Sequence, residues 1–159
     1  MVMSYIGYPK KGAFEPFACG TGDLRGATPL WVAAYDMNGD GWRRGAGNRV
    51  NRMSSSTETL RTLLDAGADH YLTTADGTTP FMVAAGLGRA TYTPREPRGV
   101  RSPGAEEAIK VLLAAGADIN ATNEADFVAL HGASFRGLNE VIELLVAEGA
   151  HIDARDFRG

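Results

Sequence analysis

The sequence has one cysteine and no long apolar run, and each shortage excludes a class of protein. A single thiol, Cys19, cannot form an internal disulfide or a thiolate zinc site. Because no stretch reaches the roughly 18 consecutive apolar residues of a membrane-spanning helix, we predict no membrane segment. The net charge of −3 is also too small to favour nucleic acid or a membrane surface as a partner.

Motifs for catalysis, metal binding and nucleotide binding are missing as well. The sequence has no His-Glu-x-x-His segment, no cysteine pair, no Gly-x-x-x-x-Gly-Lys-[Ser/Thr] loop and no Gly-x-Ser-x-Gly elbow. We expect the three histidines, His70, His131 and His151, to be structural or solvated. The sequence therefore predicts no enzyme activity, no metal site and no cofactor. The cysteine usage favours a reducing cytoplasm without requiring it.

The sequence does contain an internal repeat. Three segments end in large aliphatic residues followed by Gly-Ala, and their glycines, Gly67, Gly116 and Gly149, are 49 and 33 residues apart. Three segments also begin alike, at Thr28-Pro29-Leu30, Thr79-Pro80-Phe81 and Val128-Ala129-Leu130. A 33-residue unit with two insertions accounts for both spacings.

This repeat predicts the organisation of the chain. We expect units at 22–73, 74–122 and 123–155, with inserts at 38–55 in the first unit and 89–104 in the second. Residues 156–159 open a fourth turn, as in a fragment of a longer repeat protein or in an atypical end cap. Residues 1–21 match no unit and are expected to cap the first unit or to remain from an earlier repeat.

The sequence resembles ankyrin repeats, whose unit is a β-turn followed by two antiparallel helices. The segment Asp76-Gly77-Thr78-Thr79-Pro80-Phe81 fits the family pattern, and His131 stands at the family's histidine position. The amino-acid sequence of this segment is most similar to that of ankyrin proteins of bacteria. The resemblance implies a mostly α solenoid of stacked helix-turn-helix units with short β-turns.

Local sequence signals agree with this unit. Thr79 can cap the first helix of the second unit, and Gly116 can end the second helix in the left-handed conformation. The third unit departs from the pattern, because Val128 has no capping hydroxyl and Asp126 replaces the turn glycine. In the first unit, His70-Tyr71 replaces the usual aliphatic-Asn pair.

The resemblance also implies a protein-interaction scaffold that binds an unidentified protein through turn tips and first-helix faces. The residues that it assigns to partner binding are Leu24, Arg25, Trp31, Tyr35, Leu87, Phe127, Phe135 and Arg136. Exposed aromatic residues and arginine are enriched at protein interfaces. The alternative is that some of these aromatic residues pack against the inserts.

The inserts are rich in arginine, and each has a charge of +3 by its Arg, Asp and Glu residues. One hypothesis is a rim that binds acidic peptide, phosphate or nucleic acid. Its candidate residues are Arg43, Arg44, Arg49, Arg52, Arg95, Arg98 and Arg101. The other is two solvated loops whose arginines pair with the acidic body, which makes nucleic acid an unfavoured partner. A structural module that self-associates through an uncapped C-terminal repeat is a third alternative.

Overall fold

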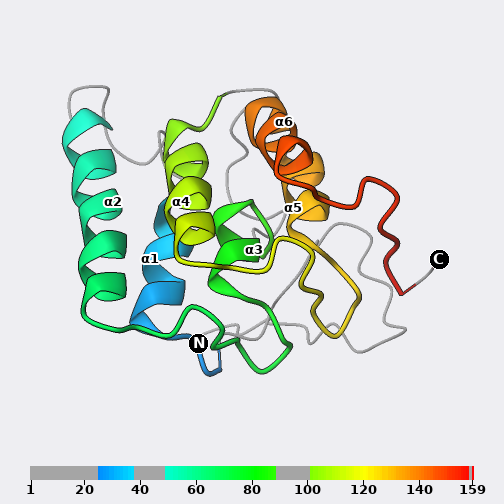
Figure 1. The fold of residues 1–159 in the computed structure, drawn as a ribbon, viewed down its shortest axis with the longest axis horizontal. Coiled ribbons are helices and arrows are strands. Elements are labelled where there is room, and N and C mark those ends of the chain that lie inside the picture. The colour runs from blue at the N-terminus through cyan, green and yellow to red at the C-terminus, as the bar shows by residue number, and fades with distance from the viewer. Residues whose placement is uncertain (1–24, 38–48, 89–100, 158) are drawn as a thin grey trace, which may run out of the picture.

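The computed structural model describes residues 25–37, 49–88, 101–157 and 159. These residues form six helices and no strand: α1 (Pro29–Met37), α2 (Arg49–Asp65), α3 (Pro80–Ala84), α4 (Pro103–Ala114), α5 (Ala129–Arg136) and α6 (Asn139–Ala147). Consecutive helices pair as α1 with α2, α3 with α4, and α5 with α6. The expected mostly α stack of helix pairs is confirmed (Figure 1).

The pairs stack in sequential order, so the helices form two layers. The first helices are in contact as α1, α3 and α5, and the second helices are in contact as α2, α4 and α6. Helix α2 begins at Arg49, within the segment 38–55 that was expected to be an insert, and α4 begins at Pro103, within the segment 89–104. Both second helices therefore take up the last part of the expected inserts.

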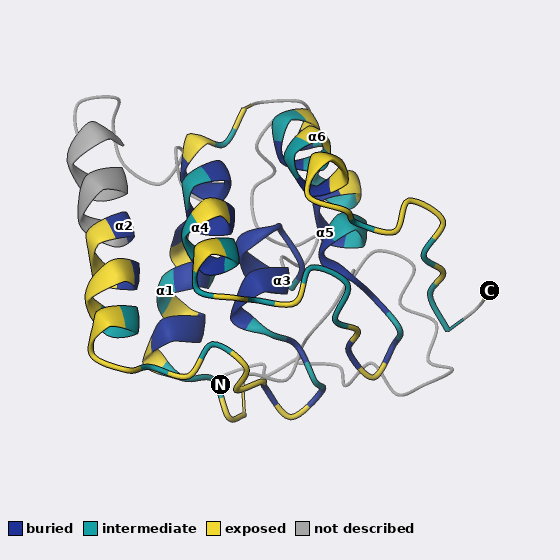
Figure 2. Cartoon of the chain, in the orientation of Figure 1, coloured by how far each residue is buried: buried dark blue, intermediate teal, exposed yellow. Residues whose placement is uncertain are grey.

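The main core lies between the two layers and runs through all three pairs. Leu30, Phe81, Ile109, Leu112 and Leu145 are all at most 1% exposed in this cluster. Figure 2 shows the buried sides of the helices turned toward one another. Phe81 of α3 and Ile109 and Leu112 of α4 face this core. Helix α4 has one apolar side, whereas all five residues of α3 are buried.

The predicted helix signals of the second unit are confirmed. The Thr79 hydroxyl accepts a hydrogen bond from the Met82 N–H at 3.1 Å, and Pro80 is the first residue of α3. Gly116 follows α4 with φ +95°, the left-handed conformation that ends a helix. Val128 makes no side-chain cap, as predicted, but the ring of His131 accepts a hydrogen bond from the Val128 N–H at 3.1 Å.

Helix α5 and the turn after α3 approach closely because position 132 has no side chain. A Cβ atom built on Gly132 would lie 2.5 Å from the backbone nitrogen of Leu87 and 3.0 Å from the Gly86 carbonyl carbon. A real Cβ does not come so close to backbone atoms, so the contact between the second and third units requires glycine at this position.

Candidate functional site

The turns that precede the first helices form a continuous backbone ladder. The Ala75 N–H donates to the Arg25 carbonyl at 2.8 Å, and the Glu124 N–H donates to the Asp76 carbonyl at 2.9 Å. The Phe157 N–H repeats this bond to the Ala125 carbonyl at 3.1 Å. Each turn is thereby fixed relative to the turn before it.

A buried polar network joins the second turn to the third. The Asn123 side chain donates to the Thr78 hydroxyl at 3.2 Å and accepts from the N–H groups of Ala125 and Phe127. Thr74 donates to the Asp76 carboxylate at 2.7 Å. Burying a polar group without a hydrogen-bond partner is unfavourable, so these bonds favour one geometry of the turns.

A second row of contacts links the loops that follow the second helices. The Asn120 side chain donates to the Gly149 carbonyl at 3.2 Å and accepts from the His151 N–H at 2.9 Å. In the preceding unit, the Tyr71 hydroxyl donates to the Gly116 carbonyl at 3.0 Å. Tyr71 therefore supplies the forward hydrogen bond that asparagine supplies one unit later.

The predicted partner-binding residues divide into three groups. Arg25 is exposed at the first turn, and Tyr35, Phe135 and Arg136 are half-buried on α1 and α5. Leu24 lies outside the described residues. The remaining residues of the set, Trp31, Leu87 and Phe127, are buried, so their expected exposure is wrong.

Trp31 is buried because its indole forms part of the contact between the first two units. The ring N–H donates to the Thr78 carbonyl at 3.1 Å, and the side chain is 2% exposed. Tyr35 stacks on the indole with ring centroids 5.4 Å apart. At this position the tryptophan bridges repeats and does not face a partner.

Leu87 and Phe127 are buried in a second, smaller apolar cluster with Met82 and Ala125. Helix α3 is only five residues long, and the chain then turns back so that the Leu87 N–H donates to the Met82 carbonyl at 3.0 Å. The Phe127 ring meets the His131 ring edge-on at 5.3 Å. Nonlocal packing thus removes both side chains from the binding surface.

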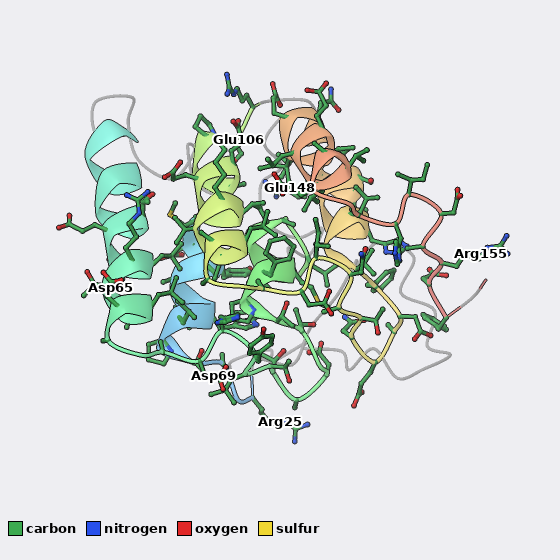
Figure 3. The ribbon with its side chains drawn as sticks, in the orientation of Figure 1. Arg25, Asp65, Asp69, Glu106, Glu148 and Arg155 are labelled. Carbon is green, nitrogen blue, oxygen red and sulfur yellow. The ribbon has the colours of Figure 1, made fainter. Side chains whose placement is uncertain are left out.

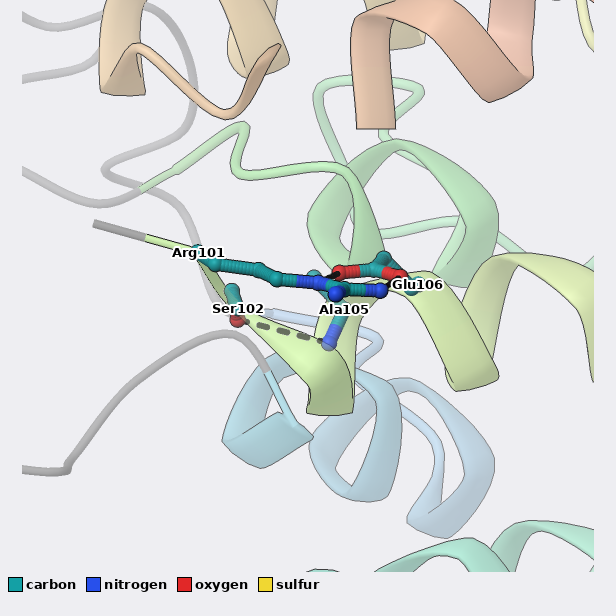
Figure 4. A network of polar contacts seen from close by, with 4 residues as sticks. All are labelled: Arg101, Ser102, Ala105 and Glu106. Atoms are coloured by element: carbon teal, nitrogen blue, oxygen red, sulfur yellow. Dashed lines mark hydrogen bonds and ion pairs between the residues drawn. The ribbon is translucent and has the colours of Figure 1, made fainter. Parts of the chain in front are cut away.

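Arg101 is the one candidate anion-binding arginine whose side chain the structure describes. Its guanidinium binds both carboxylate oxygens of Glu106, at 2.7 and 2.8 Å, beside the Ser102 cap of α4 (Figure 4). The guanidinium holds the pKa of the Glu106 carboxyl below its usual range, and the carboxylate raises the pKa of Arg101. Arg101 therefore pairs with an acidic residue of α4.

The other arginines of that set cannot be placed. Four of them, Arg43, Arg44, Arg95 and Arg98, lie outside the described residues. Arg49 and Arg52 belong to α2, but their side chains are not described. The hypothesis of an arginine rim therefore stays a prediction.

Sequence reasoning missed two exposed residues beside this surface. Val32 on α1 is 50% exposed, and Ser134 on α5 is exposed. Val32 follows the predicted Trp31 directly, and the two residues differ in exposure because one side of α1 faces α3. The motif alone does not show how the helix is rotated about its axis.

His131 helps to form the start of α5, where its ring accepts the Val128 N–H. Burial lowers the pKa of His131, although nearby Asp156 and a hydrogen bond to the Ala154 carbonyl partly oppose the shift. Within the described residues, no group of three His, Cys, Asp or Glu side chains is placed to hold a metal ion. None of the described helices is long and apolar enough to cross a membrane.

A linear stack of helix pairs, each in contact with its neighbours along the chain, defines a repeat protein of the solenoid class. The ankyrin-repeat family matches residues 76–124 and 126–157, just over half of the chain. The chain belongs to this family, whose repeats are in general protein–protein interaction modules that are typically not enzymes.

The chain is also similar to a much longer protein. The "Transient receptor potential cation channel subfamily A member 1 homolog" of Caenorhabditis elegans is 31% identical over 106 residues. The matched segment covers 67% of this chain and 7% of that protein. The chain therefore spans a small part of that relative's length.

Proposed function

We propose that this chain binds another protein through the turn tips and the exposed sides of α1 and α5. The observation that carries the proposal is the backbone ladder, in which the N–H groups of Ala75 and Glu124 bond to the preceding turns at 2.8 and 2.9 Å. Side chains on turns fixed in this way lose little further conformational entropy on binding. A partner then meets a row of preorganised contacts.

The charges along this row support a protein partner over a polyanion. Exposed Arg25, Glu124 and Arg155 lie on the loop side of the stack and carry both signs. Figure 3 shows Arg25 and Arg155 projecting from loops outside the helices. A nucleic acid favours a continuous basic surface, whereas a protein surface can match alternating charges.

Charge reversals test this proposal. The full-length chain is immobilised and used to capture proteins from an extract of its source organism. Arg25→Glu or Glu124→Arg is expected to lower capture of the specific partner about tenfold or more, because like charges meet at the interface. Glu58→Arg makes the same chemical change as Glu124→Arg, but on the exposed surface of α2. Equal capture by all variants, or loss with Glu58→Arg, would contradict the proposed surface.

A further inference from the structure

The loop between α2 and α3 carries two adjacent apolar side chains that face solvent. Tyr71 is 60% exposed and Leu72 is 52% exposed. The equivalent residues of the second unit, Asn120 and Ala121, are smaller and half-buried. The repeat fold therefore does not require large apolar side chains at these two positions. Adjacent exposed apolar residues that include a tyrosine are typical of protein-binding surfaces.

This surface, which we call the Tyr71–Leu72 patch, is held by contacts with the second unit. The Tyr71 hydroxyl donates to the Gly116 carbonyl at 3.0 Å, and its ring lies against the His70 ring with centroids 4.1 Å apart. The Tyr71 N–H donates to the Asp69 carboxylate at 2.8 Å. Because these bonds fix an exposed side chain in place, Tyr71 loses little further conformational entropy when a ligand packs on it.

The two loops beside the patch carry charges of one sign. Residues 65–73 and 114–122 include Asp65, Asp69 and Asp118, which are all exposed, and contain no lysine or arginine. Helix α2 ends on Asp65, and neither α2 nor α4 has a basic residue in its last turn. The partial negative charge of both helix C-termini therefore adds to that of the carboxylates. The patch lies in a negative potential.

The arginine-rich inserts join the opposite ends of these helices. In Figure 1, α2 and α4 run side by side in the same direction, with the inserts leading into their starts. Helix α2 has 17 residues, which separates its start from its end by about 25 Å. Within this layer, Arg61 pairs with Glu107 and Arg101 pairs with Glu106, each away from the patch. A ligand is therefore the source of positive charge that the patch can use.

We infer that the Tyr71–Leu72 patch binds a basic segment of another protein, in which lysine or arginine stands beside an apolar side chain. The apolar side chain packs on Leu72 and on the Tyr71 ring, and the cations meet Asp69 and Asp118. An arginine over the tyrosine ring also gains a cation–π interaction. The turn tips carry both charge signs, so the two surfaces select different partners. This inference does not depend on the proposed turn-tip surface.

Fluorescence anisotropy with the full chain tests this inference. The probe is a labelled peptide of repeated Gly-Arg-Leu, compared with Gly-Glu-Leu and Gly-Arg-Ser peptides of the same length. At about 50 mM NaCl, the first peptide is expected to bind with a dissociation constant below about 100 µM, and the other two at least about tenfold more weakly. A dissociation constant above about 1 mM for Gly-Arg-Leu, or equal binding by either other peptide, overturns the inference.

One pair of variants tests the apolar contact. Leu72→Ala introduces the residue that the second unit has at the equivalent position 121, so the fold tolerates it. This variant is expected to raise the dissociation constant of the Gly-Arg-Leu peptide at least about threefold. Val146→Ala shortens another exposed side chain, on α6, and is expected to leave binding unchanged. The inference is wrong if Leu72→Ala binds like the parent chain or if both variants weaken binding equally.

A second pair tests the charges. Asp69→Asn combined with Asp118→Asn removes two carboxylates but keeps the oxygens that accept backbone N–H groups. The dissociation constant is expected to rise at least about fivefold and to depend less on salt. Glu58→Gln combined with Glu143→Gln removes two exposed charges from α2 and α6 and is the control. Equal weakening by both double variants would show general attraction to an acidic protein and would overturn the inference.

Discussion

At the scale of single residues, His131 combines a structural role with a sensitivity to pH. One ring nitrogen accepts a hydrogen bond from the Val128 N–H at the start of α5, and the ring also bonds to the Ala154 carbonyl. Only the neutral ring can make the two bonds together, because the nitrogen that accepts from Val128 must be unprotonated, whereas the bond to Ala154 is open to either form. Burial lowers the pKa of His131 accordingly.

A lowered pKa in the folded state means that the unfolded chain takes up the proton first as the pH falls. The contribution of neutral His131 is therefore complete above its usual pKa of 6.5 and is lost below it. Urea denaturation is expected to give a larger fall in unfolding free energy between about pH 7.5 and about pH 5.5 for the parent chain than for His131→Gln. His151→Gln changes an exposed histidine and is expected to keep the parent slope. Equal slopes for the parent chain and His131→Gln would contradict this role.

The contact between the second and third units requires that residue 132 have no side chain. Gly132→Ala would place a Cβ atom 2.5 Å from the Leu87 nitrogen, and the obstacle is backbone that cannot rotate away. We expect this variant to lower the unfolding free energy by about 1–3 kcal/mol, as overpacked cores do. Ser134→Ala, an exposed substitution on the same helix, serves as the control in the same urea titration. A Gly132→Ala variant as stable as Ser134→Ala would mean that α5 and the turn after α3 are not so closely packed.

At the scale of elements, hydrogen bonds between successive loops join one helix pair to the next. Asn120→Ala removes two of these bonds, from the side chain to Gly149 and from the His151 N–H. Tyr71→Phe removes one, to Gly116. We expect losses of about 1–2 kcal/mol for the first variant and about 0.5 kcal/mol for the second, because exposed groups can bond to water instead. Chemical denaturation measures both, with exposed Thr122→Ala as control. Asn120→Ala matching this control would show that the loops do not couple the units.

Elements whose signals are local were predictable from the sequence. The Thr79 cap, the start of α3 at Pro80 and the end of α4 before Gly116 depend on residues within a few positions of one another. The repeat spacing then gave the order of the helix pairs. These predictions needed no knowledge of which side of a helix meets which neighbour.

The binding surface was harder to predict because it depends on contacts between units. Trp31 is buried through a hydrogen bond to Thr78, which is 47 positions away along the chain. Leu87 and Phe127 are buried by packing against Met82 and Ala125, on both sides of the second insert. The position in the family motif alone therefore placed three side chains on the surface, whereas in the structure they pack between units.

At the scale of the whole molecule, stability is a sum over neighbouring pairs, and position in the stack decides how far a defect spreads. The middle pair, α3 with α4, contacts both other pairs, whereas α5 and α6 contact only the middle pair among the described helices. In such a linear stack, weakening the middle unit removes support from both sides, and weakening an end unit leaves the other two in contact.

Two equivalent leucines allow this difference to be measured. Leu112 on α4 and Leu145 on α6 are both 0% exposed, and either change to alanine is expected to cost about 2–5 kcal/mol locally. In hydrogen exchange, Leu145→Ala should lower amide protection in α5 and α6 while α1 to α4 keep theirs, and Leu112→Ala should lower it in all six helices. Equal loss across the chain for both variants would indicate a single cooperative unit. The helix pairs would then not act as separable modules, and the stack could not transmit a defect stepwise from one end.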